Sequence, residues 1–263
     1  SGCSGGRGER CHPPPAASSL ALIQRIEIDP GQAGHDPAEG AGLVVPVREV
    51  LEVAANTRVE AFCLADVEDL AMGVLVQVDP RGGGQEADLR EQAAALGRAA
   101  DARLAAGAPS VDVIGYSSGG VVGRIWADEL GGAGLARRIV TLGSPHHGTD
   151  IARLGAAIAP GACPEACRQV VPGSELLADL AETVPGPVWT AVWTAQDAVV
   201  TPPESAVLDG AVNVRVQDVC GDARIGHSQL PTDPLVVGLV ALAVGVEPLD
   251  EVPDAARCDE IRT

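Results

Sequence analysis

Lysine is absent from this chain of 263 residues, and aromatic side chains are scarce. All 18 positions that carry Lys or Arg are arginine, and Ala, Gly, Pro and Val dominate, a composition that GC-rich codons produce. With so few aromatic rings, the core has to be built from Val, Leu, Ile and Ala. The five aromatic residues are Phe62, Tyr116, Trp126, Trp189 and Trp193.

The chain also lacks a long apolar run and an excess of positive charge. The longest apolar segment, residues 235–246, is about half of the roughly 20 residues that span a bilayer, which excludes a membrane-spanning helix. Thirty-six acidic residues against 18 basic ones give a net charge of −18, which repels phosphate backbones and argues against nucleic acid as a partner. The 46% hydrophobic and 21% charged residues are typical of a soluble globular protein and exclude a disordered or fibrous chain.

No signal peptide is visible at the start of the chain, because residues 1–6 contain neither a charged region nor an apolar one. Small residues before Cys3 and a Gly/Ser run after it resemble the acylated cysteine and flexible tether of a bacterial lipoprotein. A polar tail without a lipid is the alternative. Both interpretations make residues 1–18 a flexible tail, followed by a single domain over residues 19–263.

Seven cysteines indicate either a disulfide set or a zinc site. Cys163 and Cys167 lie four residues apart, but no second close Cys/His pair follows at the distance that a zinc finger needs, so disulfides are favoured. Disulfides indicate an oxidising compartment and hence a secreted or extracellular protein. Spacing alone does not determine the pairing; our hypothesis joins Cys163 to Cys167 and Cys220 to Cys258. The odd count leaves at least one thiol over.

Strands and helices alternate from about residue 86 onward. Residues 86–106 repeat apolar side chains at spacings of three and four, which predicts an amphipathic helix. Residues 111–115 indicate a buried strand, and after a tight turn residues 120–130 indicate a helix. This alternation predicts an α/β fold with a mostly parallel sheet and helices on both faces. Further strands are predicted at 138–142, 188–194 and 212–216, and further helices at 174–182 and 233–244.

Residues 19–80 fit this scheme poorly. They contain plausible strands at 20–28 and 72–78 and a helix-like piece at 47–55. However, eleven acidic residues within 27–79 meet only two arginines. The topology of this segment does not follow from its pattern.

The segment Gly115-Tyr116-Ser117-Ser118-Gly119 matches the nucleophile elbow G-x-S-x-G. Its small residues let the chain reverse between a strand and a helix while the serine is held in a strained conformation with an exposed hydroxyl. The match gains weight because the strand before it and the helix after it are predicted independently. The start of that helix also directs N–H groups toward the site of a developing oxyanion. A Gly/Ser loop without chemistry is the alternative.

A serine nucleophile needs a histidine to take its proton and a carboxylate to orient that histidine. In the order Ser, Asp, His, Asp197 follows the strand predicted at 188–194 by three residues. His227 lies in the loop between the last predicted strand and the last predicted helix. Asp218 and Asp222 are alternatives to Asp197, but they lie on the connection that carries the histidine.

The remaining four histidines are weaker candidates for the base. His12 and His35 precede the serine motif. His146 and His147 follow the next strand along the chain, which is too early for the base in this order.

Residues 111–150, with Ser-Pro-His-His-Gly-Thr at 144–149, resemble the bacterial secreted lipases and esterases of the α/β-hydrolase fold. The resemblance continues through residues 163–177, 193–206 and 220–239 and covers about the C-terminal two thirds of the chain. It implies a carboxylic ester hydrolase that acts on a small ester or lipid substrate without a cofactor. Calcium occurs in related lipases, but no acidic cluster in this sequence singles out a metal site.

The same resemblance assigns the site residues. It implies Ser117 as nucleophile, Asp197 as acid and His227 as base. The backbone N–H of Ser118 would supply one oxyanion donor, and the apolar residues 151–159 either contribute to an acyl pocket or lid or serve packing alone. Expected substrate contacts are Tyr116, His146 and His147.

One family feature is missing. Family members usually carry a His-Gly pair in the N-terminal third that supplies the other oxyanion donor, and here no such pair precedes His147; the nearest is Gly34-His35-Asp36. Loss of one donor costs about a hundredfold or more in rate. Two explanations stay open: a substitute donor from another loop, or a changed reading frame before about residue 80. Reading the coding DNA in all frames distinguishes between them. The alternative function class is a catalytically impaired hydrolase-like binding protein, surface-anchored through Cys3.

Overall fold

The computed structural model describes residues 49–54, 57–63, 72–78, 88–105, 107–159, 161 and 163–262. The three segments before residue 88 are described by their backbone alone. The expected tail at residues 1–18, the candidate anchor Cys3 and the expected strand at 20–28 lie outside the described residues.

Seven strands in the described part of the chain form one sheet, in which they lie side by side in chain order. The first three pair antiparallel, and from β3 to β7 all pairs are parallel. The expected helix-like piece at 47–55 is wrong, because residues 49–54 of that segment form the strand β1, which pairs antiparallel with β2. The strands are β1 (Glu49–Ala54), β2 (Thr57–Cys63), β3 (Met72–Val78), β4 (Val111–Tyr116), β5 (Ala136–Leu142), β6 (Val188–Trp193) and β7 (Val212–Arg215).

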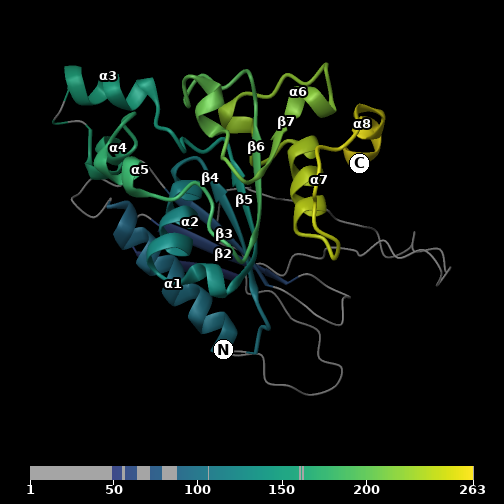
Figure 1. The fold of residues 1–263 in the computed structure, drawn as a ribbon, viewed down its shortest axis with the longest axis horizontal. Coiled ribbons are helices and arrows are strands. Elements are labelled where there is room, and N and C mark those ends of the chain that lie inside the picture. Colours follow the sequence, from purple (N-terminus) through teal and green to yellow (C-terminus); the bar gives the residue numbers. More distant parts are fainter. Residues whose placement is uncertain are drawn as a thin grey trace.

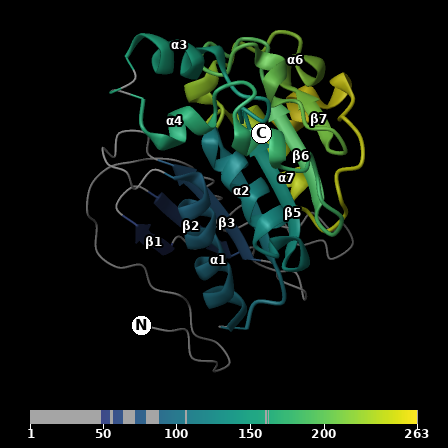
Figure 2. The same cartoon turned by 60° about the vertical axis from the view of Figure 1, so that its left-hand side comes forward.

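Helices cover both faces of the sheet, as the alternating pattern predicts. In Figure 1, α1 and α2 lie to the left of the strands and α7 to their right, and Figure 2 shows α1 and α2 in front of the sheet. The carboxyl ends of the parallel strands are at the top of Figure 1, next to α3 and α6. The helices are α1 (Leu89–Ala105), α2 (Ser118–Glu129), α3 (Asp150–Ile158), α4 (Glu165–Gln169), α5 (Glu175–Asp179), α6 (Val216–Val219), α7 (Pro234–Ala243) and α8 (Cys258–Ile261). Short 3₁₀ turns are η2 (Gly132–Gly134), η4 (Pro203–Ala206), η5 (His227–Gln229) and η6 (Ala255–Arg257).

Each central strand buries side chains on both faces. In β4, Val113 packs into the core beneath α1 and α2, whereas the next residue, Ile114, packs into the core beneath α7. In β5, Ile139 and Val140 divide in the same way. Parallel strands covered on both faces need this continuous apolar sequence. The expectation of a largely aliphatic core is confirmed, with Trp126 and Trp189 as its large aromatic members.

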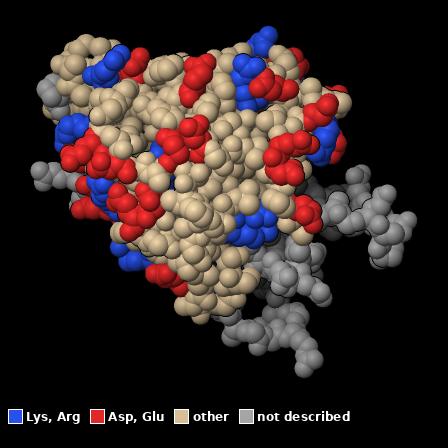
Figure 3. All heavy atoms as spheres, in the orientation of Figure 1, with Lys and Arg blue, Asp and Glu red and all other residues tan. Residues whose placement is uncertain are grey.

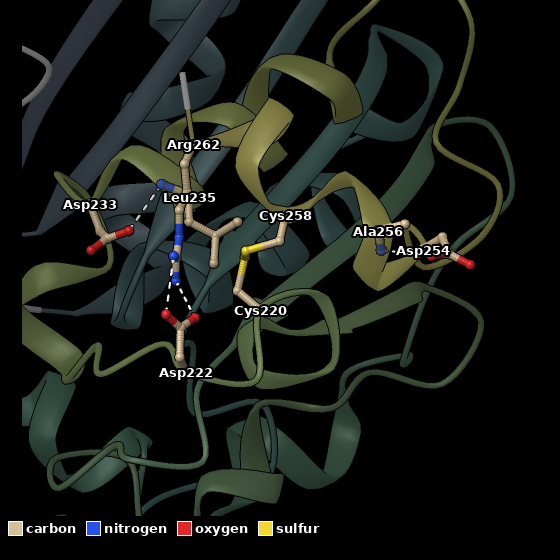
Figure 4. The surroundings of a disulfide bond; sticks show 8 residues. All are labelled: Cys220, Asp222, Asp233, Leu235, Asp254, Ala256, Cys258 and Arg262. Carbon is tan, nitrogen blue, oxygen red and sulfur yellow. Dashed lines mark hydrogen bonds and ion pairs between the residues drawn. A yellow bond between two sulfur atoms is a disulfide. The ribbon is translucent and has the colours of Figure 1, made fainter.

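Both disulfides of our hypothesis are present. Cys163 bonds to Cys167 and Cys220 to Cys258, with Cα–Cα separations of 5.3 and 5.2 Å. The second bond ties α8 to the segment that follows α6 (Figure 4). Beside it, the guanidinium of Arg262 donates to both carboxylate oxygens of Asp222, at 2.8 and 3.4 Å. Two links thus hold the C-terminal segment against the connection that leads to His227.

Several ion pairs lie at the surface, for example between Arg90 and Glu129 at 2.8 Å. Others have a buried partner, as in the pair between Arg137 and the fully buried Asp112. On the face shown in Figure 3, acidic side chains lie beside arginines toward the margins, with an uncharged tract between them. In the described part of the chain, every helix is too short or too polar to cross a bilayer. The same residues contain no cluster of three or more His, Cys, Asp or Glu side chains arranged to hold a metal ion.

Candidate active site

The strand β4 ends in a sharp turn at Ser117. This residue has φ 54° and ψ −130°, and it is the one non-glycine residue with positive φ among those described. Its N–H donates to the carbonyl of Leu142 at the end of β5 (2.9 Å), and α2 begins at the next residue. A serine in such a sparsely populated conformation costs on the order of 1–3 kcal/mol, which the surrounding structure has to offset. Ser117 thus lies between the carboxyl end of β4 and the first residue of α2.

Two glycines allow this turn. A Cβ on Gly115 would lie 2.5 Å from the Cα of Gly120, so β4 and the first turn of α2 touch through their backbones. A Cβ on Gly120 would lie 2.1 Å from the Oγ of Ser144 in the loop after β5. The expected motif includes Gly115 but not Gly120. The Gly119-Gly120 doublet in the sequence is a signal that could have identified Gly120 as part of this turn.

The structure brings the three expected catalytic residues together. The Nε2 of His227 lies 3.1 Å from the Oγ of Ser117, and its Nδ1 lies 2.7 Å from the Oδ2 of Asp197. His227 and Asp197 are buried, with 8% and 7% of their surfaces exposed. A neutral imidazole that donates from Nδ1 to a carboxylate leaves Nε2 free to accept the serine proton.

Backbone groups hold the carboxylate in place. The Oδ1 of Asp197 accepts the N–H groups of Val199 and Val200, both at 2.8 Å, which leaves Oδ2 for His227. Gly143 lies directly against this pair with φ 53°, and a Cβ there would come within 3.1 Å of Asp197 Oδ2 and 3.3 Å of His227 Nδ1. The sequence analysis missed Gly143, although a glycine directly after a strand at the carboxyl edge is a usable signal.

Ser118 occupies the position expected of an oxyanion donor. It is the first residue of α2 and follows Ser117 directly. The first N–H groups of a helix have no acceptor within the helix, so they are available to a developing negative charge. The segment Gly34-His35-Asp36, the nearest match to the missing His-Gly pair, lies outside the described residues.

Tyr116 contacts the candidate base. Its hydroxyl donates to the carbonyl of His227 at 3.2 Å, and the two rings lie 5.1 Å apart between centroids with a tilt of 35°. Burial, with a smaller contribution from the charge of Asp197, raises the pKa of Tyr116 to about 12. The hydroxyl therefore stays protonated at neutral pH, and its hydrogen bond goes to the main chain of His227 rather than toward a substrate.

The adjacent histidines, both expected to contact substrate, have opposite environments. His146 is completely buried, and its Nε2 lies 3.1 Å from the Oγ1 of Thr141. Burial, followed by the charges of Arg124 and His147, lowers the pKa of His146 well below its usual value, so its ring is neutral. His147 is half-exposed, and its Nε2 lies 3.0 Å from Glu182. A buried His146 is out of reach of a substrate, which favours a structural role for that side chain.

A buried arginine connects the segments around the site. Arg124 in α2 is 1% exposed and donates to three carbonyls, those of His146 (3.0 Å), Leu180 (3.3 Å) and Ala181 (2.8 Å). Burial lowers the pKa of its guanidinium, and nearby acidic side chains partly counter that effect. The sequence analysis missed this residue. An arginine among the apolar residues of the helix predicted at 120–130 is the signal that could have identified it.

A solved fungal lipase has a similar fold. Lipase B of Aspergillus fumigatus aligns with 71% of this chain and 48% of its own, at 17% sequence identity and a TM-score of 0.54. The mature lipase BlEst2 of Bacillus licheniformis aligns with 48% of this chain and 64% of its own, at 17% identity and a TM-score of 0.41. No protein-family model matches the chain, and no curated protein matches it significantly. The chain thus spans about half the length of lipase B and has an α/β-hydrolase fold.

Proposed function

We propose that the protein is a serine carboxylic ester hydrolase of the lipase or esterase type. The observation that carries the proposal is the hydrogen-bonded series Ser117–His227–Asp197 at the carboxyl edge of the sheet, with the serine in a strained turn. The fold that it shares with lipase B of Aspergillus fumigatus supports the same class. Its substrates would be triacylglycerols or esters of short to medium acyl chains.

The proposed reaction uses these three residues in two halves. As the Ser117 hydroxyl attacks the ester carbonyl, His227 Nε2 accepts its proton, and a bond forms between Oγ and the carbonyl carbon. The negative charge on the former carbonyl oxygen faces the N–H of Ser118 at the positive end of α2. His227 then gives its proton to the leaving alkoxide, and an acyl-enzyme remains on Ser117.

In the second half of the reaction, water takes the place of the serine hydroxyl as the nucleophile. His227 takes a proton from a water molecule, which attacks the acyl carbon, and then returns that proton to Ser117 as the acid departs. Asp197 stabilises the imidazolium in both halves and keeps Nδ1 protonated. Acyl transfer and the cleavage of thioesters or polyesters would use the same residues.

Two disulfides support an exported protein, since such bonds persist in oxidising compartments. A lipid anchor at Cys3 remains part of the proposal. A thioether-linked lipid on that cysteine would show as a mass increase of the N-terminal peptide in the protein isolated from its source.

Hydrolysis of a short and a long p-nitrophenyl ester by the wild type and by Ser117→Ala tests the function. The variant should lose at least about 10⁴-fold in kcat, because nucleophilic attack is lost while binding remains. Ser110→Ala, in the residue directly before β4, is the matched control and should keep wild-type turnover. Equal turnover of wild type and Ser117→Ala would refute the mechanism.

The missing His-Gly pair favours one alternative, a hydrolase-like binding protein with an incomplete oxyanion hole. Covalent labelling by a fluorophosphonate separates the two proposals because it needs an activated serine. Labelling that disappears in Ser117→Ala supports the enzyme. A folded wild type that stays unlabelled and inactive supports the binding protein.

A further inference from the structure

The candidate acid and base are carried by different loops. Asp197 follows β6, whereas His227 follows β7 and α6, thirty residues later in the chain. The 2.7 Å contact between their side chains therefore depends on something that holds the two loops together. Thr194, the first residue after β6, has hydrogen bonds to both loops.

Thr194 is completely buried, and its hydroxyl uses its full hydrogen-bonding capacity. It donates to the carbonyl of Ile225 at 2.7 Å. It accepts the side-chain N–H of Gln217 at 2.9 Å and the backbone N–H of Gln196 at 3.2 Å. A hydroxyl has one donor and two acceptor positions, so all three are occupied.

Gln217 in α6 completes the connection. Its Oε1 accepts the backbone N–H of Ala195 at 3.1 Å, while its Nε2 donates to Thr194. Only this orientation of the amide satisfies both partners, because the Ala195 N–H can only donate and the Thr194 hydrogen is directed to Ile225. The carboxamide thus joins the acid loop to the element just before the base loop.

We propose that Thr194 is a positioning residue that sets the distance between Asp197 and His227. Its hydroxyl holds Ile225, two residues before the base, and Gln196, one residue before the acid. It touches no reacting atom and acts through these two backbone segments. The expected effect on kcat rests on the proposed ester hydrolysis. The expected effect on the distance between Asp197 and His227 rests on the structure alone.

Removing this hydroxyl would leave the buried carbonyl of Ile225 without its donor. The partly buried N–H groups of Gln196 and Gln217 would lose their shared acceptor. The two loops can regain hydrogen bonds only by moving apart or by admitting water. Either change lengthens the contact between Asp197 and His227. Displacements of about 1 Å far from the chemistry can cost on the order of a hundredfold in rate.

The test compares Thr194→Val, which keeps the shape and removes the hydroxyl, with Thr194→Ser, which keeps the hydroxyl. We expect the valine variant to lose about tenfold or more in kcat with KM changed less than about twofold, since a positioning loss acts on the transition state. The serine variant should recover kcat to within about threefold of wild type. Circular dichroism at the assay temperature establishes that each variant is folded.

A proton NMR spectrum supplies a readout independent of turnover. The proton shared by His227 Nδ1 and Asp197 should give a resonance at the low-field end of the spectrum in the wild type and in Thr194→Ser. We expect it to be lost or shifted in Thr194→Val. If the wild type shows no Ser117-dependent turnover, the proposed function fails, and the resonance still decides whether Thr194 positions the pair.

A second substitution guards against a valine variant that does not fold. Gln217→Leu removes the amide from a half-buried position and should lower kcat in the same direction, by a smaller factor. Wild-type kcat and an unchanged resonance in folded Thr194→Val, or in Gln217→Leu if the valine variant is unfolded, would overturn the proposal. So would equal losses in Thr194→Val and Thr194→Ser, which indicate packing rather than positioning.

Discussion

Tyr116 and His227 are in contact through both ring and hydroxyl: the Tyr116 hydroxyl donates to the His227 carbonyl at 3.2 Å, and the rings lie 5.1 Å apart. Tyr116 is the last residue of β4, directly before Ser117. One side chain thus joins the strand that carries the candidate nucleophile to the loop that carries the candidate base. From this contact we predict that Tyr116 supports the base. The sequence placed Tyr116 among the substrate contacts, and that prediction also remains to be tested.

Tyr116→Phe should therefore lower kcat more than it raises KM. The substitution removes the hydrogen bond and keeps the ring, so we expect a loss of about threefold to tenfold in kcat, which corresponds to roughly 0.5–1.5 kcal/mol for one neutral hydrogen bond. Steady-state kinetics on a p-nitrophenyl ester measures both constants. A raised KM with unchanged kcat would instead indicate a direct substrate contact.

The ionisation of Tyr116 can be followed directly, because it is the one tyrosine in the sequence. Its pKa is raised to about 12, against a usual value of 10.0. Since the unfolded chain releases this proton first, the associated stability is fully present below pH 10 and decreases as the pH rises through the folded pKa. A near-ultraviolet absorbance titration of the native protein should show a midpoint near 12, and a midpoint near 10 would contradict the buried position.

The three candidate catalytic residues could be predicted because their signals are local and ordered. Ser117 stands between a strand and a helix that are each visible in the hydrophobic pattern, and Asp197 and His227 follow at successive strand ends. Parallel strands bring such ends to one edge of the sheet, so chain order alone predicts their proximity. The α/β fold was predictable for the same reason.

The supporting residues could not be predicted in this way. Thr194 donates to the carbonyl of Ile225, thirty-one positions away. A Cβ at Gly143 would meet Leu230, Asp197 and His227, a packing arrangement that no local pattern encodes. The adjacent residues His146 and His147 have the same chemistry, yet one is buried and the other half-exposed. Their difference depends on how the loop after β5 folds over α2.

His146 should make the protein less stable in mild acid. Its pKa is lowered well below 6.5 by burial, then by Arg124 and His147, so between its folded pKa and pH 6.5 the unfolded chain binds a proton that the native state does not. Stability should fall by up to about 1.4 kcal/mol per pH unit within that window. Urea unfolding of wild type and His146→Gln at several pH values measures this slope. An identical slope in both would show that another group is responsible.

Gly143→Ala should damage both stability and turnover. The added Cβ would meet Leu230 Cδ1 at 2.5 Å and approach Asp197 Oδ2 at 3.1 Å, in a backbone conformation that costs alanine about 1 kcal/mol or more. We expect a loss of roughly 2–3 kcal/mol in unfolding free energy together with a lower kcat. Gly134→Ala is the matched control, because a Cβ there meets nothing within 4 Å. Equal behaviour of the two variants in thermal unfolding and ester hydrolysis would refute this account.

The two disulfides should contribute unequally to stability. Cys220–Cys258 closes a loop with a sequence separation of 38, and Cys163–Cys167 one with a separation of 4. Constraining the unfolded chain is worth about 4 kcal/mol for the longer loop and about 2 kcal/mol for the shorter one. The paired variants Cys220→Ser/Cys258→Ser and Cys163→Ser/Cys167→Ser, compared by urea unfolding, test this order.

The longer disulfide should also affect the base, because it ties α8 to the segment that leads to His227. Arg262 and Asp222 remain paired without it, and Ile261 stays packed against Gly238, where a Cβ would lie 2.0 Å from the Ile261 carbonyl. These contacts should keep the Cys220→Ser/Cys258→Ser variant folded at room temperature. We therefore expect a large decrease in its unfolding free energy but only a small decrease in kcat. A fully unfolded variant at room temperature would show that the disulfide, rather than this packing, holds the C-terminal segment in place.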